Sequence, residues 1–140
     1  IASDPYAAAL RGFVRRLGLN SCVELTGPVS AGGLAAHYRA ADVYVCLSEH
    51  EGFCVPLLEA MHHGVPIVAF GVAAVPETLG DAGICLPDKT PTLVAQAVHR
   101  VLTDAALRGQ LLAAGTGRLQ LFTLEKTRAR FLEAIEPVLT

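Results

Sequence analysis

The sequence predicts an α/β fold in which helices cover a doubly wound parallel sheet. Residues 42–47 form a nearly continuous apolar run, which predicts a strand buried on both faces, and a further strand is expected at 66–70. Segments with helical periodicity alternate with these strands, and this order implies parallel strands joined by right-handed crossovers. The chain has 140 residues, 52% of them apolar and 17% charged, enough for a domain with its own core. We therefore expect residues 1–140 to form a single domain.

The first third of the chain predicts two helices and two strands. Asp4 and Pro5 open the first helix, whose apolar stripe ends before Gly18. Residues 22–26 alternate between apolar and polar side chains, which predicts a strand. Ser30 is a good N-cap for a helix over about 31–40. The second strand, residues 42–47, follows it.

The rest of the chain continues the alternation and then becomes helical. Gly64 ends a helix that begins near Val55. The further elements that we expect are a strand at 66–70, a short helix from 75, a strand at 83–86, a helix after Thr90-Pro91, a helix from Asp104 to about Leu112 broken by Gly115 and Gly117, and a final helix over about 122–140.

Charge and cysteine content exclude several classes of function. The net charge of −2 gives no support for nucleic-acid binding. The longest stretch without a charged residue, 60–76, contains Gly, Pro and His and does not predict a membrane span. Cysteines 22, 46, 54 and 85 form no Cys-x-x-Cys pair, which favours buried free thiols over a disulfide framework or a metal site. With no signal peptide visible at the first residues, we expect a cytoplasmic location.

The segment 48–61 predicts the end of a strand, a glycine turn and the start of a helix. Pro56 suits the first helical position, and Gly52 lets a ligand approach the backbone. The amides from about Phe53 to Leu57 would then be unpaired at a helix N-terminus, where partial positive charge collects. This arrangement predicts an anion site made of backbone and best suited to phosphate.

Two glutamates flank the predicted anion site. Glu51 lies on the turn, and Glu59 lies on the helix, whose side chains lean toward its N-terminus. Carboxylates repel phosphate oxygens but accept hydrogen bonds from hydroxyls. A ligand with a phosphate core and hydroxyl-rich groups on both sides fits this pattern, and a nucleotide sugar is such a ligand.

The spacing of Glu51 and Glu59, with seven residues between them, resembles that of retaining glycosyltransferases with the two-domain GT-B architecture. Several separate blocks extend the resemblance to glycosyltransferase family 4 over nearly the whole chain: Ala40-Ala41-Asp42-Val43, Glu51-Gly52-Phe53, Pro56, Glu59-Ala60-Met61, Gly64-Val65-Pro66-Ile67-Val68 and Val75-Pro76-Glu77. The resemblance implies a Rossmann-like C-terminal half of a GT-B fold, which binds the nucleotide-sugar donor.

The resemblance also implies roles for individual residues. Glu51 would orient the donor sugar as the catalytic residue, and Glu59 would hold the ribose. Amides near Phe53, Cys54 and Val55, beside Gly52, would stabilise charge on the leaving phosphate. The loop Gly27-Pro28-Val29 would lie near the donor, although a plain turn fits these residues equally well, and Glu77 is balanced between a structural role and ligand contact. Such enzymes generally need no metal, so we expect no cofactor.

The charge pattern indicates that the donor site needs further residues. No lysine or arginine lies between Arg39 and Lys89, yet a diphosphate normally requires full cations. In the family these cations follow a strand that would precede Ile1, and a separate N-terminal domain binds the acceptor. We therefore expect the isolated chain to be inactive, with its final helix packing back or crossing to the N-terminal domain. That domain could also bring the enzyme to the inner face of a membrane.

Two alternatives stay open at this stage. A glycosidase also uses paired carboxylates, about 5–9.5 Å apart across an open sugar site. The turn between Glu51 and Glu59 fits phosphate better than it fits that arrangement. The other alternative is a non-catalytic module that senses a nucleotide or binds a protein.

Overall fold

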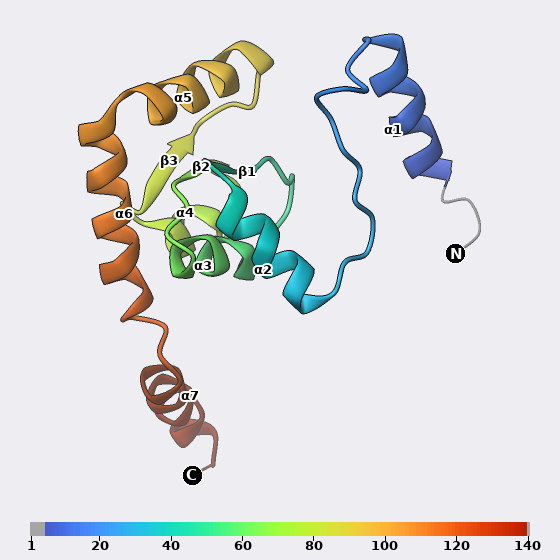
Figure 1. Cartoon of the computed structure of the whole chain (residues 1–140). Coiled ribbons are helices and arrows are strands. Elements are labelled where there is room, and N and C mark those ends of the chain that lie inside the picture. Colours follow the sequence, from blue (N-terminus) through green and yellow to red (C-terminus); the bar gives the residue numbers. More distant parts are fainter. Residues whose placement is uncertain (1–4, 140) are drawn as a thin grey trace. The chain divides into compact units, whose positions relative to one another are not determined.

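The computed structural model describes residues 5–139 and contains two compact units, residues 1–34 and 35–140 (Figure 1). The first unit holds α1 (Pro5–Arg16), an irregular segment and the beginning of α2 (Ala31–Ala40). Ser30 caps α2 as expected, because its Oγ accepts a hydrogen bond from the Gly33 amide at 3.1 Å. The second unit contains the sheet and the remaining helices.

The strand expected at residues 22–26 does not form. The amides of Cys22 and Val23 instead donate to the Leu19 carbonyl, at 3.0 and 2.9 Å, and close a turn after α1. The described part of the first unit has no strand that could pair with this segment. Alternating side chains favour a strand only where a neighbour takes up the backbone hydrogen bonds, so the prediction was wrong.

The second unit is built on a parallel sheet in the order β1-β2-β3, with β1 at Tyr44–Cys46, β2 at Ile67–Phe70 and β3 at Gly83–Leu86. Tyr44 lies opposite Ile67, which in turn lies opposite Gly83. A β-carbon at Gly83 would lie 2.8 Å from the Ile67 carbonyl oxygen, so only glycine fits the closest contact between β2 and β3. The parallel sheet predicted from the sequence is confirmed.

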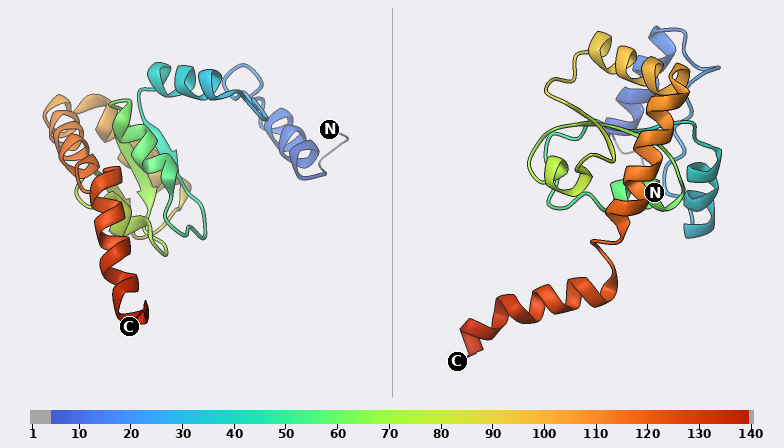
Figure 2. Two further views of the ribbon diagram at one scale, coloured as in Figure 1. Left: turned by 90° about the horizontal axis from the view of Figure 1, so that it is seen from below. Right: turned by 90° about the vertical axis from the view of Figure 1, so that its left-hand side faces the viewer.

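Successive residues of β2 face two separate hydrophobic cores. Ile67 and Ala69 pack with residues of α3 (Val55–His62) and α4 (Val75–Leu79), whereas Val68 packs with residues of α5 (Pro91–Thr103) and α6 (Ala105–Leu119). Figure 2 gives two further views of the sheet and its helices. The central strand is thus buried on both faces. The same burial was predicted for the strand at 42–47 and is wrong there, because Val45 in the middle of β1 is 37% exposed.

Helix α6 does not break at Gly115 and Gly117 as expected, but continues to Leu119. A β-carbon at Gly115 would lie 3.3 Å from Met61 Cγ, so the glycine lets α6 lie close against α3. The packing outweighs the helix penalty of glycine, which is about 1 kcal/mol. Asp104 caps the helix, with its carboxylate accepting from the Leu107 amide at 2.9 Å.

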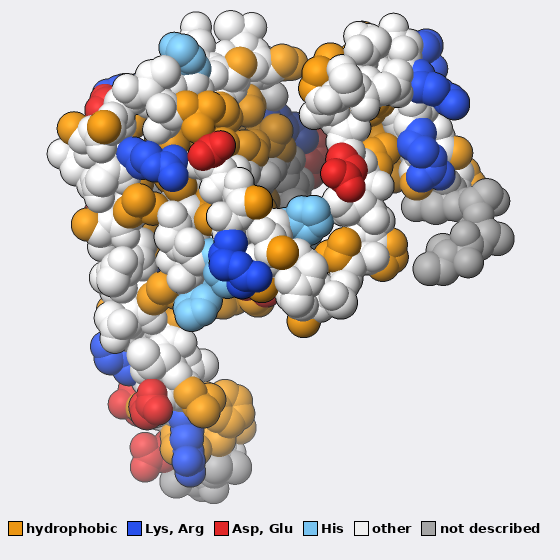
Figure 3. Space-filling model, viewed as in Figure 1, with side chains coloured by type: hydrophobic (Ala, Val, Ile, Leu, Met, Phe, Trp, Pro, Cys, Tyr) orange, Lys and Arg blue, Asp and Glu red, His pale blue; other side chains and the backbone are white. Residues whose placement is uncertain are grey.

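The final helix, α7 (Leu124–Leu139), carries apolar side chains on its surface. Phe131 and Leu132 are 62% and 49% exposed, and Figure 3 shows apolar atoms on this helix at the bottom of the view. Its expected packing against another domain stays a prediction. Among residues 5–139, no helix is both long enough and apolar enough to cross a membrane.

Candidate functional site

The loop from β1 to α3 has the strand–turn–helix form predicted for residues 48–61. β1 ends at Cys46 and α3 begins at Val55, so that Pro56 is the second helical residue instead of the first. Cys54 precedes the helix in the left-handed region, with φ 65° and ψ 61°. That conformation costs a residue with a β-carbon about 1–2 kcal/mol, so the surrounding structure must hold Cys54 in place.

Three backbone amides at the N-terminus of α3 are candidate donors for a ligand. Within residues 5–139, no hydrogen bond from the amides of Phe53, Cys54 and Val55 is found. The expectation that Leu57 would also be unpaired was wrong, because its amide donates to the Cys54 carbonyl at 3.0 Å. Three adjacent amides at the positive end of a helix dipole can bind an anion.

The loop is fixed by contacts with two other elements. The Thr78 hydroxyl on α4 donates to the Phe53 carbonyl at 2.6 Å, and this threonine is 1% exposed. The Glu51 carbonyl accepts from the Ala74 amide at 3.4 Å. These bonds keep the amides of the turn in one orientation, which reduces the entropy lost when a ligand binds.

An ion pair also joins the loop to the segment after β3. Lys89 Nζ lies 2.6 Å from Glu49 Oε1 in an exposed ion pair. The ammonium group lowers the pKa of the Glu49 carboxyl, first through the hydrogen bond and then through its charge. Lys89 is therefore already engaged with an acid of this loop.

Glu59 is oriented by a buried tyrosine of another helix. Tyr38 lies on α2, and its hydroxyl donates to Glu59 Oε2 at 3.0 Å. Tyr38 is 7% exposed and its ring stacks on His63 at a centroid distance of 5.4 Å. Burial raises the pKa of the Tyr38 hydroxyl, and the hydrogen bond to Glu59 raises it further. The hydroxyl of a buried tyrosine needs a hydrogen-bond partner. This rule was the signal from which a polar contact of Tyr38 could have been predicted.

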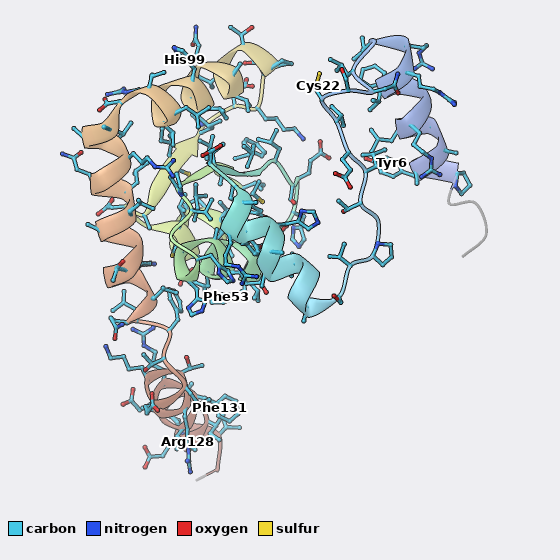
Figure 4. The ribbon with its side chains drawn as sticks, viewed as in Figure 1. Tyr6, Cys22, Phe53, His99, Arg128 and Phe131 are labelled. Carbon is cyan, nitrogen blue, oxygen red and sulfur yellow. The ribbon has the colours of Figure 1, made fainter. Side chains whose placement is uncertain are left out.

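Glu51 lies beside two buried thiols. The sulfurs of Cys46 and Cys54 are 3.8 Å apart, and a carboxylate oxygen of half-buried Glu51 lies within 4.8 Å of both. Burial raises the pKa of the Cys54 thiol to about 12, and Cys46 and the Glu51 carboxylate add to the shift. The prediction of buried thiols is confirmed for these two residues. It is wrong for Cys85 and for Cys22, which Figure 4 labels, because both are exposed.

A pocket of about 340 Å³ opens beside Gly52 and Phe53. Its further lining residues are Ala74, Glu77, Thr78, Arg118, Leu121, Phe122 and Arg130. The guanidinium of Arg118 donates to the carbonyls of Glu77 and Thr78 and lies 5.3 Å from the centre of the Phe122 ring. The sequence analysis did not place Arg118 and Arg130 near the turn, because they lie far along the chain from Gly52.

Gly27, Pro28 and Val29 belong to the first unit, and their expected position near the donor stays a prediction. Gly27 has φ 64°, and its carbonyl accepts from the Thr26 hydroxyl at 3.3 Å. The positive φ explains the glycine there, since residues with a β-carbon rarely adopt it.

Comparison with known proteins places the chain among sugar transferases. Residues 1–104 match the model of the family described as glycosyl transferases group 1. The D-inositol 3-phosphate glycosyltransferase of Kineococcus radiotolerans is 34% identical over 135 residues, which are 89% of this chain and 31% of the relative. The chain thus spans less than a third of that relative's length.

Two solved structures share the fold. Sucrose-phosphate synthase from Thermosynechococcus elongatus superposes with a TM-score of 0.78 at 28% identity, over 93% of this chain and 33% of that one. The C-terminal domain of the group 1 glycosyl transferase LpcC from Francisella tularensis gives 0.71 at 26% identity, over 85% of this chain and 63% of that one. With the parallel sheet and the family match over residues 1–104, these likenesses lead to one conclusion: the chain belongs to the group 1 glycosyl transferases and has the GT-B-like fold of their C-terminal domain.

Proposed function

We propose that this chain is the donor-binding part of a retaining family 4 glycosyltransferase and binds a nucleotide-activated sugar. The observation that carries the proposal is the turn before α3, where the amides of Phe53, Cys54 and Val55 have no partner within residues 5–139. Glu51 lies before these amides and Glu59 one helical turn after them. Along the chain, donors for a phosphate thus lie between two acceptors for hydroxyls.

The amides would hold the diphosphate and stabilise the charge that grows on it as the sugar leaves. A hydrogen bond to a charged group contributes about 1.5–3 kcal/mol. Gly52 adds no side chain beyond its backbone, so the phosphate oxygens can approach the turn closely. The bond from Thr78 to the Phe53 carbonyl supports this function by fixing the turn before a ligand arrives.

Glu59 would bind the ribose of the donor. One of its oxygens accepts from Tyr38 at 3.0 Å, and this bond sets the direction of the carboxylate on α3. The other oxygen of the oriented carboxylate can then accept from ribose hydroxyls. Tyr38 thereby acts as a positioning residue for Glu59.

Glu51 would orient the donor sugar, and neither glutamate needs to be a nucleophile. Transfer would proceed with retention at the anomeric carbon and without a metal ion. The loop Gly27-Pro28-Val29 would border the donor. The acceptor would bind to a separate N-terminal domain in a cytoplasmic enzyme, a division of labour consistent with the short share of its relative that this chain spans.

Glutamine variants of the complete enzyme test the proposal. We expect Glu59→Gln to weaken the affinity for both the nucleotide sugar and the nucleoside diphosphate, because the ribose contact is common to both. Glu51→Gln should lower turnover with little change in diphosphate affinity. Glu125→Gln, at an exposed position on α7, is the matched control.

Isothermal titration against a panel of nucleotide sugars, together with turnover assays, measures these effects. Unchanged donor affinity and turnover in both site variants would overturn the proposal. Release of sugar from an unactivated glycoside by the wild-type enzyme would point to a glycosidase. Donor binding without transfer to any acceptor would favour the non-catalytic module.

A further inference from the structure

We propose that Cys46, Cys54 and Glu51 form a binding site for a thiophilic divalent cation such as Zn²⁺ or Cd²⁺. Their ligand atoms, two sulfurs and a carboxylate oxygen, all lie within 4.8 Å of one another. In the part of the chain that the structure describes, this is the one group of three His, Cys, Asp or Glu residues whose ligand atoms lie this close together. Thiolates together with a carboxylate favour zinc or cadmium over magnesium or calcium, which prefer sites made of oxygen ligands.

The distance between the sulfurs already matches coordination of one ion. Cys46 Sγ and Cys54 Sγ are 3.8 Å apart. A tetrahedral zinc ion with Zn–S bonds of about 2.3 Å separates two sulfurs by about 3.8 Å. Both side chains could therefore bind one ion without a movement of the backbone, whereas a disulfide would require the sulfurs to approach to about 2.05 Å.

The backbone holds the two cysteines in this arrangement. Cys46 is the last residue of β1, and Cys54 precedes α3 with its left-handed φ of 65°. Both are buried, at 6% and 4% exposure. The Cys54 carbonyl accepts from Leu57, and the neighbouring Phe53 carbonyl accepts from Thr78. A preformed pair of ligands binds a metal with less loss of conformational entropy.

A divalent ion would offset most of the negative charge of its three ligands. Two thiolates and a carboxylate around a divalent ion give a net charge of −1, next to the N-terminus of α3, where the helix dipole favours negative charge. Binding releases the two thiol protons to solvent. Glu51 is only half-buried, so a cation can enter from its side and keep a water as the fourth ligand.

The consequence for activity rests on the proposed function. A bound ion would take the Glu51 carboxylate away from the donor sugar and place negative charge beside the amides that hold the diphosphate. We call residues 47–54, between β1 and α3, the donor loop, after the function proposed for it. We therefore expect Zn²⁺ to inhibit the transferase by binding at this loop.

Cadmium titration of the complete, reduced enzyme tests the site directly. The absorbance band of cadmium–thiolate bonds should reach saturation at one equivalent for this site.

Cys54→Gly removes a ligand at a residue whose positive φ suits glycine, so the variant keeps the fold. We expect it to bind cadmium at least about tenfold more weakly. Cys85→Ser, at an exposed cysteine on β3, is the control and should bind like the wild type. Equal cadmium affinity in Cys54→Gly and the wild type would overturn the site.

A second measurement separates this inference from the proposed function. Within each variant, turnover is compared with and without Zn²⁺, and only the ratio is used. Inhibition in the wild type but not in Cys54→Gly supports both the metal site and the function of Glu51. Cadmium binding without inhibition by Zn²⁺ would keep the site but contradict the function of Glu51 in the donor loop. Absence of the cadmium band, with normal donor turnover, would overturn the site and leave the transferase proposal intact.

Discussion

The hydroxyl of Tyr38 donates a hydrogen bond to Glu59 Oε2 across 3.0 Å, and so joins α2 to the predicted ribose-binding residue on α3. The ring of Tyr38 contacts the rings of Tyr44 and His63, with centroids 5.8 and 5.4 Å away. The direction of the Glu59 carboxylate is therefore set by an aromatic cluster in the core, outside the donor loop itself.

Tyr38→Phe should reduce donor affinity without unfolding the protein. The ring stays packed, while Glu59 loses the bond that orients it, and the loss of such a bond typically lowers stability by about 0.5–1.5 kcal/mol. Titration calorimetry with the donor and urea unfolding measure the two effects. In a Glu59→Gln background, Tyr38→Phe should add little further loss of affinity. Full additivity of the two affinity losses would show that Tyr38 does not act through Glu59.

Thr78→Val should loosen the donor loop. The buried hydroxyl of Thr78 is the donor to the Phe53 carbonyl, and removing it leaves that acceptor without its partner, at about 1–3 kcal/mol of stability. Hydrogen exchange of the amides in 52–55 should become faster. Thr116→Val is the matched control, since this exposed threonine bonds only within α6, to the Leu112 carbonyl. Equal destabilisation of the two variants would contradict the anchoring function of Thr78.

Two glycines of α6 should respond in opposite ways to substitution. Gly109 has no atom within 4 Å of the position of an added β-carbon, so Gly109→Ala should stabilise the protein by about 0.5–1 kcal/mol through helix propensity. Gly115 meets Met61 at 3.3 Å, so Gly115→Val should overpack the contact with α3 and destabilise the protein by about 1–3 kcal/mol. Urea unfolding compares them. A stable Gly115→Val variant would mean that α3 and α6 do not lie this close.

The ion pair between Glu49 and Lys89 should be visible in the titration of Glu49. Because Lys89 lowers the pKa of this carboxyl, the pair is complete above the ordinary glutamate pKa and is lost as the pH falls through the lowered value. Lys89→Met should return the pKa of Glu49 upward toward its ordinary range. NMR measurement of the Glu49 carboxyl chemical shift against pH gives this pKa in the wild type and in Lys89→Met. Identical titrations in the two proteins would rule out the pair.

The sequence predicted the strand–turn–helix form of this loop well because its signals are local. A buried apolar run, a glycine turn and Pro56 follow one another within 43–56, and together they specify the strand, the turn and the helix start. The segment 22–26 shows the limit of such patterns. Its alternation is common to a strand and to an extended loop, and only a hydrogen-bonding neighbour distinguishes the two.

The contacts that orient the site could not be predicted in the same way. Tyr38 reaches Glu59 on α3, Thr78 reaches the loop before α3 and Arg118 reaches α4, each from an element that is distant in the chain. The pairing of Cys46 with Cys54 was missed for a related reason: a spacing of eight residues carries no metal-binding signature until the turn brings the sulfurs together. Gly115 likewise has a meaning only once α6 lies against Met61.

The most direct test of the central claim is NMR of the backbone amides of Phe53, Cys54 and Val55 in the complete enzyme. The enzyme is saturated with the nucleoside diphosphate of the donor that the panel selects. We predict large shift changes and slower exchange for these three amides, and little change for Leu57, whose amide already donates to the Cys54 carbonyl. A saturated enzyme in which all three amides keep their shifts and exchange rates would contradict the donor site proposed for this turn.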